Sequence, residues 1–319
     1  MSLALVFPGQ GSQSVGMGKD LAESFATGRE TFREIDDTLG QKLSTLMFEG
    51  PESDLNMTEN TQPALMAVSM AIVNILQRDA GLRIEKIAAF AAGHSLGEYS
   101  ALTATGALEM AACAKLLKTR GIAMQKAVPV GIGSMAAILG MDLSDVVAVA
   151  KQASQQAGKE LVCQAANDNS VGQVVVSGHA AAVQIAVDLA SAAGAKKAVI
   201  LPVSAPFHCS LMAPAAQTMA YALADTNIRV PCVPVVSNVT AKGETEPSEI
   251  RRLLVDQITG LVRWRESVLW MKEQGVTEII EIGSGKVLSG LIKRIDKDIT
   301  CESVGTAEQV TALIKKLKG

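Results

Sequence analysis

The chain has 319 residues, of which 48% are apolar and 19% charged, and its mean hydropathy is +0.26. This composition supplies enough apolar side chains for a packed core and too little charge for a disordered protein. The net charge is −3, and no basic excess or basic cluster is present, which argues against a nucleic-acid-binding protein.

The cysteines are odd in number and scattered, with no C-x-x-C pair and no His/Cys spacing typical of a metal site. We therefore expect free, reduced thiols in a cytoplasmic protein without a bound metal. No stretch of about 18 apolar residues runs without a charge, glycine or proline, so no membrane span is expected.

Short apolar runs alternate with longer amphipathic stretches along the first and last parts of the chain. This alternation is typical of an α/β protein with a mostly parallel sheet. The predicted strands are Leu3–Phe7, Ile87–Ala92, Cys232–Ser237 and Thr277–Ile282. Apolar residues at helical spacing predict helices over Gln62–Asp79 and Leu108–Lys126.

The middle of the chain has a different pattern, with the order strand, helix, strand, strand, helix, strand. The six segments are Ser134–Leu139, Leu143–Ala157, Leu161–Ala166, Gln173–Ser177, Ala180–Ala193 and Ala198–Val203. This order is that of the ferredoxin-like split βαβ arrangement. Pro129 and Pro202 lie near its two ends, so we predict an inserted domain over 130–202 and a discontinuous catalytic domain over 1–129 and 203–319.

The sharpest local motif is Gly93-His94-Ser95-Leu96-Gly97, between the strand 87–92 and a helix-compatible run, Glu98–Thr105. This is the G-x-S-x-G nucleophile elbow in its strand–turn–helix context, which predicts an α/β-hydrolase-like catalytic domain. Ser95 would lie at a helix N-terminus, where the dipole and the free N–H of Leu96 can stabilise an oxyanion. The alternative is a turn with a purely structural role.

A serine nucleophile needs a base, and the chain has only three histidines. His94 adjoins the nucleophile, and we expect its side chain to point elsewhere. His179 follows a predicted strand and is expected to be a solvated turn residue. Elimination leaves His208, just after the inserted segment, as the candidate base, with a packed or surface histidine as the alternative.

At these residues the sequence resembles the malonyl-CoA:acyl-carrier-protein transacylase family, and the resemblance covers essentially the whole chain. The segments that carry it are FPGQGSQ (Phe7–Gln13), GHSLGEYSAL (Gly93–Leu102), the run Thr119–Pro129, APFH (Ala205–His208), NSVGQVVVSG (Asn169–Gly178) and EIGSGKVLSGL (Glu281–Leu291). One departure is Ser284, which stands where proline is common.

The resemblance implies a set of catalytic roles. Ser95 would be the acylated nucleophile and His208 its base. The backbone N–H of Gln10 would join that of Leu96 in the oxyanion hole. The backbone carbonyl of Gln257 would orient the histidine in place of an aspartate, although the neighbouring Asp256 is an obvious rival for that role.

The resemblance also implies the residues that bind the acyl group. Arg120 would pair with the free carboxylate of malonyl, which a planar guanidinium can grip bidentately. Position alone leaves open a solvated residue on a helix that also carries Lys115 and Lys118. Asn169 aligns with an active-site asparagine, and the bulky Phe207 favours malonyl over methylmalonyl.

The implied reaction transfers malonyl from malonyl-CoA, through a malonyl-Ser95 intermediate, to the phosphopantetheine thiol of acyl-carrier protein for fatty-acid synthesis. It requires no metal or redox cofactor, and we expect a monomer. Because such carriers are acidic, a basic surface near the cleft is expected. The candidates are Lys286, Lys293, Arg294 and Lys297, for which an ordinary solvated helix face is the alternative.

Three other functions remain open. A serine thioesterase or hydrolase shares the elbow but does not explain Arg120 or the FPGQGSQ turn. A malonyltransferase of a malonate decarboxylase system would use the same residues with a different carrier. A catalytically dead binding module is disfavoured because nucleophile, base and carboxylate ligand are all present.

Overall fold

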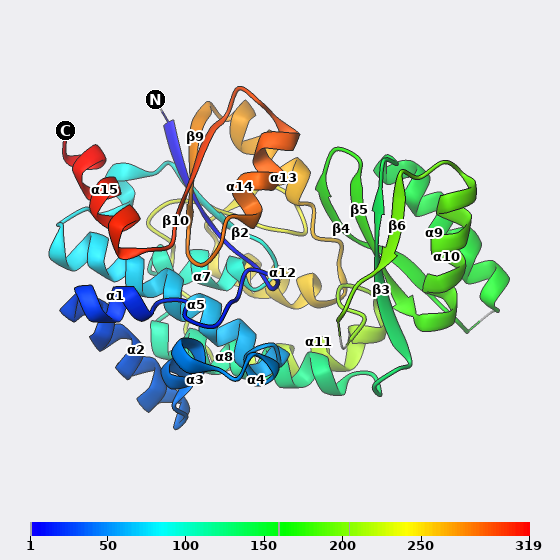
Figure 1. The fold of residues 1–319 in the computed structure, drawn as a ribbon, viewed down its shortest axis with the longest axis horizontal. Coiled ribbons are helices and arrows are strands. Elements are labelled where there is room, and N and C mark those ends of the chain that lie inside the picture. The colour runs from blue at the N-terminus through cyan, green and yellow to red at the C-terminus, as the bar shows by residue number, and fades with distance from the viewer. Residues whose placement is uncertain (1, 159, 204) are drawn as a thin grey trace.

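The computed structural model describes residues 2–158, 160–203 and 205–319. A six-stranded sheet lies at the centre of the larger unit, in the order β10-β9-β1-β2-β7-β8 (Figure 1). The strands β10, β9, β1, β2 and β7 are parallel, and β8 is an antiparallel edge strand. Their bounds are β1 (Ser2–Phe7), β2 (Phe90–Gly93), β7 (Val235–Val236), β8 (Gly243–Glu244), β9 (Val276–Ile282) and β10 (Thr300–Val304).

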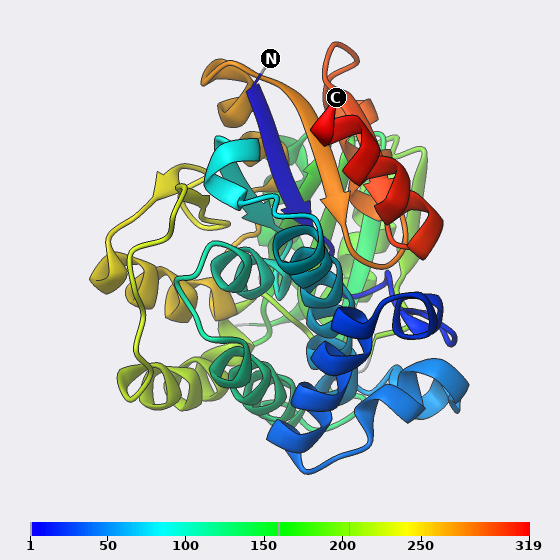
Figure 2. The same ribbon diagram turned by 90° about the vertical axis from the view of Figure 1, so that its left-hand side faces the viewer.

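Helices surround this sheet, and both termini lie at the same end of the molecule (Figures 1 and 2). The α-helices of the larger unit are α1 (Lys19–Ser24), α2 (Ala26–Leu39), α3 (Leu43–Glu49), α4 (Glu52–Leu55), α5 (Thr58–Asn74), α6 (Ile84–Ile87), α7 (Gly97–Ala104), α8 (Met110–Lys126), α11 (Ala213–Ala224), α12 (Pro247–Thr259), α13 (Trp264–Glu273), α14 (Val287–Ile295) and α15 (Ala307–Lys318). A π-helical turn, η1 (Ile75–Asp79), extends α5, and a 3₁₀ turn, η2 (Ser210–Met212), precedes α11. Within the described residues, none of the helices is long and apolar enough to cross a membrane.

The central strand β1 is buried on both faces, because its alternating side chains enter two different cores. Leu3, Leu5 and Phe7 pack into the large core that contains α2, α5 and α8. Ala4 and Val6 face the opposite core, built around α13 and α14. Successive side chains of a strand point to opposite faces, so a continuous apolar run allows both faces of a parallel strand to be buried. The predicted strand 3–7 and the predicted helices 62–79 and 108–126 are confirmed.

A second unit carries an antiparallel sheet with strand order β4-β5-β3-β6 (Figure 1). Its elements are β3 (Gly133–Leu139), α9 (Leu143–Ala157), β4 (Cys163–Ser170), β5 (Gln173–His179), α10 (Ala180–Ala192) and β6 (Lys197–Ile200). Both helices pack on this sheet around a separate apolar core. The chain order and strand order are those of the ferredoxin-like arrangement, so the predicted fold class is confirmed. The domain boundaries at 129/130 and 202/203 stay predictions.

Four predicted strands have clearly different bounds in the structure, and one of them, predicted over 198–203, is β6, which already ends at Ile200. The run 87–92 begins with the last residue of α6, and β2 starts only at Phe90. The prediction began too early because a short apolar run does not distinguish a helical turn from a strand. The run 232–237 is reduced to β7, since Pro234 has no N–H for a ladder. The strand predicted over 161–166 is instead β4, which continues to Ser170 with two register shifts.

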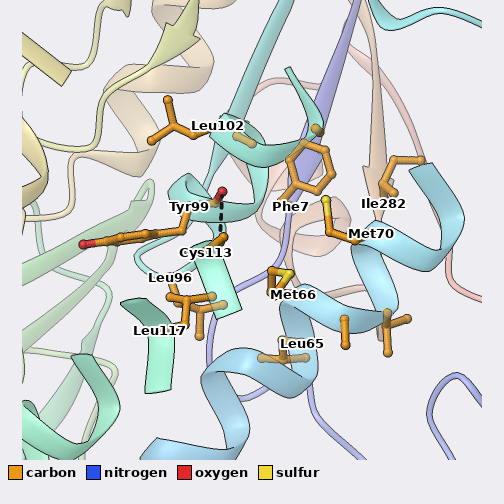
Figure 3. Close-up of a cluster of buried hydrophobic side chains, with 14 of the residues drawn as sticks. Phe7, Leu65, Met66, Met70, Leu96, Tyr99, Leu102, Cys113, Leu117 and Ile282 are labelled. Atoms are coloured by element: carbon orange, nitrogen blue, oxygen red, sulfur yellow. Dashed lines mark hydrogen bonds between the residues drawn. The ribbon is translucent and has the colours of Figure 1, made fainter. Parts of the chain in front are cut away.

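Behind the loop between β2 and α7, the α7 helix is almost completely enclosed. Tyr99 and Leu102 of this helix belong to the same buried apolar cluster as Phe7 of β1 and Met66 and Met70 of α5 (Figure 3). Such a close-packed interior allows little movement of the helix that it surrounds. The packing therefore fixes the N-terminus of α7, where the candidate nucleophile lies.

Candidate active site

The candidate nucleophile, Ser95, lies on a sharp turn between β2 and α7, with a backbone φ of 52°. Glycine is required on either side of it. A Cβ on Gly93 would lie 1.9 Å from the Gly97 carbonyl carbon, and a Cβ on Gly97 would lie 2.2 Å from the Phe7 oxygen. The positive φ of a non-glycine residue is the strained geometry of a nucleophile elbow, which exposes the hydroxyl.

Asn238 holds this turn from outside the motif. Its Oδ1 accepts a hydrogen bond from the Ser95 N–H at 2.7 Å, and its Nδ2 donates to the Gly93 carbonyl at 2.7 Å. Its own N–H donates to the Glu98 carboxylate at 3.0 Å. One buried amide thus satisfies two backbone groups of the turn, the N–H of the nucleophile and the carbonyl two residues before it.

His208 is the histidine that reaches the nucleophile, with Nε2 at 2.8 Å from Ser95 Oγ. Its Nδ1 lies 2.9 Å from the backbone carbonyl oxygen of Gln257. Because a carbonyl can only accept, Nδ1 carries the proton and Nε2 is free to accept the serine proton. The rival orienting group, Asp256, instead forms an ion pair with Arg252 on α12.

Burial, and after it the charge of the Arg120 guanidinium, lower the pKa of His208 to about 3, against the raising effect of the Gln257 carbonyl. The imidazole is therefore neutral near pH 7. A neutral imidazole beside a serine hydroxyl is the state that a general base must have before it accepts a proton.

Two backbone N–H groups near Ser95 are free to bind an oxyanion. Gln10 and Leu96 both line the cavity at the nucleophile. Within the described parts of the chain, neither N–H has a hydrogen-bond acceptor. The loop that carries Gln10 is held by Ser284, whose Oγ donates to the Ser12 carbonyl at 2.8 Å. Two free backbone donors in the wall of one cavity are what a two-donor oxyanion hole requires.

Arg120 of α8 is 1% exposed, which is unusual for a charged side chain. Its Nη2 donates to Ser95 Oγ at 3.1 Å and to Gln257 Oε1 at 2.8 Å, and its Nη1 donates to Gln62 Oε1 at 2.9 Å. Its Nε is buried without an acceptor, and no carboxylate among residues 2–158, 160–203 and 205–319 forms an ion pair with it. The guanidinium is thus held at the nucleophile with part of its bonding capacity unused.

A cavity of about 180 Å³ opens above these groups. Its lining combines the polar residues described above with apolar side chains from both units, among them Met124, Met135, Val175, Leu201, Val203 and Phe207. Phe207 is buried and forms part of the wall beside His208. The volume suits a short acyl group with the thioester carbon near Ser95.

The expectation that His94 points away from the site is wrong. Its ring lines the cavity, and its Nε2 lies 2.8 Å from Oδ1 of Asn169 on β4. Burial lowers the pKa of His94, with the Asn169 hydrogen bond opposing it. The pair links the elbow to the second unit. The sequence suggested Asn169 by resemblance alone, and nothing in the local pattern indicated its histidine partner.

The expectation that His179 is a solvated turn residue is also wrong. It ends β5, is partly buried, and its Nδ1 accepts a hydrogen bond from the Val162 N–H at 3.0 Å. It does not line the cavity at Ser95.

Sequence reasoning did not identify three buried residues that complete the site. Gln62 binds Arg120, Asn238 holds the elbow, and Glu98 binds the side chain of Gln257. Only Glu98 could have been suspected from the sequence. It lies in the first turn of a buried helix, and a buried glutamate is almost always paired with another group.

The four basic residues proposed for carrier docking lie on and beside α14, and all four side chains are exposed. Among the described residues, no cluster of histidine, cysteine or acidic side chains could hold a metal ion.

Comparisons with known proteins show the family to which the chain belongs. Residues 4–318 match the acyl transferase domain family. The malonyl CoA-acyl carrier protein transacylase of Escherichia coli K12 is 45% identical over 312 residues, which cover 98% of each chain. The enzyme of the same name from Bacillus subtilis 168 is 43% identical over 316 residues, covering 99% of this chain and 97% of its own.

Solved structures give the same result. An acyl-carrier-protein S-malonyltransferase from Bartonella henselae is 52% identical and has a TM-score of 0.95, with 100% of both chains covered. A malonyl-transacylase in complex with its type II PKS acyl-carrier protein is 42% identical, with a TM-score of 0.94 over 99% of this chain and 100% of its own. The chain therefore belongs to the acyl transferase domain family and, within it, to the malonyl-CoA:acyl-carrier-protein transacylases, and it is an acyltransferase.

Proposed function

We propose that this enzyme carries malonyl from coenzyme A to the phosphopantetheine thiol of an acyl-carrier protein, with Ser95 as the acylated intermediate. The observation that carries the proposal is Arg120, a buried guanidinium without a carboxylate partner whose Nη2 lies 3.1 Å from Ser95 Oγ. A cation in this position favours an acyl group that brings its own carboxylate.

In the first half-reaction, Ser95 Oγ attacks the malonyl thioester carbonyl while His208 Nε2 takes the hydroxyl proton. The N–H groups of Gln10 and Leu96 stabilise the oxyanion of the tetrahedral intermediate. Collapse breaks the C–S bond. The thiolate of coenzyme A leaves with the proton from His208, and malonyl remains as an ester on Ser95.

In the second half-reaction, the carrier's phosphopantetheine thiol occupies the place of coenzyme A. His208 takes the thiol proton, the sulfur attacks the ester carbonyl, and the proton returns to Ser95 Oγ as the C–O bond breaks. No external proton, electron or metal enters this balance. A base oriented by a backbone carbonyl suffices, because a thioester is an activated acyl donor.

The carrier is the part of this proposal that rests on a relative, since one structural neighbour was solved with its acyl-carrier protein. We propose that the exposed basic residues on and beside α14 bind an acidic carrier surface. The variant Lys293→Glu/Arg294→Glu should raise the KM for the carrier and leave the KM for malonyl-CoA unchanged. Equal KM values for the carrier in the two proteins would place the docking surface elsewhere.

The test of the function is the intact mass of the protein after mixing with malonyl-CoA or with acetyl-CoA. We expect a malonyl adduct that persists, forms poorly with acetyl-CoA, and moves to a phosphopantetheinylated carrier when one is added. The variant Ser95→Ala should form no adduct and still bind the carrier.

The same experiment separates the other functions. An adduct that decays to free malonate before the carrier is added would identify a hydrolase. An adduct that forms equally well from acetyl-CoA would identify an acyltransferase without malonyl selectivity. A stable malonyl adduct that transfers only to a carrier of another type would favour a malonate decarboxylase system.

A further inference from the structure

Glu98 is a buried acid that the proposed reaction does not use. Its side chain is in the first turn of α7 and is 3% exposed. Its Oε2 accepts hydrogen bonds from the Asn238 N–H at 3.0 Å and from Gln257 Nε2 at 2.8 Å. Burial raises the pKa of Glu98 to about 7, against these hydrogen bonds and the attraction of Arg120.

The partner of Glu98, the amide of Gln257, can adopt two orientations that differ only in which end carries the oxygen. Its Nε2 donates both to Glu98 and to the Ser95 carbonyl, at 3.0 Å to the latter. This leaves Oε1 facing Arg120 Nη2 at 2.8 Å. In the opposite orientation, the amide N–H groups would face the guanidinium N–H groups, and two sets of donors cannot bond to each other.

We propose that Glu98 is a positioning residue for acyl-group selectivity, because its carboxylate oxygen fixes the Gln257 amide in the orientation that holds Arg120 beside Ser95. This inference rests on the proposed function, since it assigns Arg120 to the malonyl carboxylate. Glu98 does not line the cavity, so it acts on the site through its hydrogen-bond partners, and of these only Gln257 bonds to Arg120.

The role requires an acceptor oxygen and does not require a charge. Glu98→Gln keeps that oxygen opposite the two donors and should keep the ratio of kcat/KM for malonyl-CoA to kcat/KM for acetyl-CoA within about threefold of wild type. Glu98→Met has a similar length and no acceptor of comparable strength. It should lower the ratio by about tenfold, mainly through a higher KM for malonyl-CoA. A misoriented Gln257 amide loses its hydrogen bond to the charged Arg120 guanidinium, and a bond to a charged group is worth at least that factor.

A matched control separates positioning from general loss of stability. Glu281 is another fully buried acid, and it accepts from the N–H groups of Leu288 and Ser289 at the start of α14, without contact to Arg120 or Gln257. Glu281→Met should lower the Tm as Glu98→Met does, with the malonyl-to-acetyl ratio unchanged. If Glu98→Met does not fold, Glu98→Leu replaces it.

A double variant shows whether the effect passes through Gln257. Gln257→Leu keeps the backbone carbonyl that bonds His208 and removes the amide. If Glu98 acts through that amide, Glu98→Met adds nothing to the selectivity loss of Gln257→Leu. Additive losses, or an unchanged ratio in Glu98→Met, would overturn the inference while leaving the proposed function intact. A wild-type protein without malonyl preference would overturn both.

Discussion

A buried guanidinium without an ion-paired acid is costly, and at Arg120 the acceptors of its hydrogen bonds are all neutral oxygens. Gln62, Gln257 and Ser95 supply these oxygens, and the Tyr99 ring lies 5.7 Å from the guanidinium carbon. Neutral acceptors compensate a buried charge less well than a carboxylate does. The site therefore holds a cation that a ligand carboxylate would stabilise.

The variant Arg120→Lys tests this geometry. A lysine keeps the positive charge but cannot bridge three acceptors, because its ammonium is a point charge on a flexible stem. We expect kcat/KM for malonyl-CoA to fall by about 100-fold and that for acetyl-CoA to change by less than about threefold. Steady-state kinetics with both thioesters measure this, and equal losses for the two would mean that Arg120 supports the fold rather than the acyl group.

The lowered pKa of His208 predicts an unusual pH dependence of acylation. A lowered pKa means that the neutral, proton-accepting form persists as the pH falls, here to about 3. Between pH 7.5 and 5.5 the rate of Ser95 acylation should change by less than about twofold, whereas a histidine with its ordinary pKa near 6.5 would lose about tenfold.

Rapid mixing of malonyl-CoA with the Glu98→Gln variant is the suitable measurement. That substitution removes a nearby carboxyl whose pKa, about 7, falls in the same range. A tenfold fall centred near pH 6.5 would show that His208 is protonated like an exposed histidine.

Residues that belong to a sequence motif were predictable, and the residues that hydrogen-bond to them were not. The elbow motif indicated Ser95, and the small number of histidines left His208 by elimination. Asn238 and Gln62 escaped notice because an isolated amide has no pattern in a sequence. Their importance appears only when folding brings them beside Ser95 and Arg120 from 143 and 58 residues away.

At the scale of elements, the β2–Ser95–α7 turn depends on glycine at two of its own positions, Gly93 and Gly97, where a Cβ would meet backbone atoms. We expect Gly97→Ala to lower the Tm strongly and to abolish acylation, since its Cβ would meet the Phe7 oxygen at 2.2 Å. Gly290→Ala is the matched control. A Cβ at this helical position meets nothing within 4 Å, so the substitution should stabilise the protein by about 0.5–1 kcal/mol.

Thermal unfolding and the mass assay measure both variants. Full acylation of Gly97→Ala would contradict the proposed tightness of the turn.

Helices and strands with a regular spacing of apolar residues were predictable to within a few residues, and elements of mixed polarity were not. The helix predicted over 143–157 has the same bounds in the structure. β4 was predicted too early because its second half, Asn167 to Ser170, is polar and reads as a loop. These residues are in a strand because they pair with β5. They also contact the larger unit, where Asp168 N–H donates to the Val262 carbonyl and Asn167 forms a bridge with the same residue. A tertiary contact thus overrides the local preference.

At the scale of the whole molecule, the two units are joined along β4. Asp168 is 1% exposed and accepts from Arg265 Nε of α13 at 2.9 Å and 3.2 Å. We expect Arg265→Ala to destabilise the protein by about 3 kcal/mol, because it leaves a buried carboxylate without its cation. Arg252→Ala, which removes exposed ion pairs on α12, should cost less than about 1 kcal/mol.

Denaturant unfolding of both variants gives the comparison. Equal losses would mean that the Asp168–Arg265 pair does not hold the units together.

The order of the chain also sets when the enzyme becomes reactive during its own synthesis. Ser95 and His208 are 113 residues apart, with the entire second unit between them. At about 5–20 residues per second, a ribosome needs roughly 6–20 s to make that segment. β1, made first, must still wait for β9 (Val276–Ile282) to pair along its free edge. A nascent chain therefore carries a serine without its base on an incomplete sheet, and the acyl chemistry begins only when nearly all of the polypeptide has emerged.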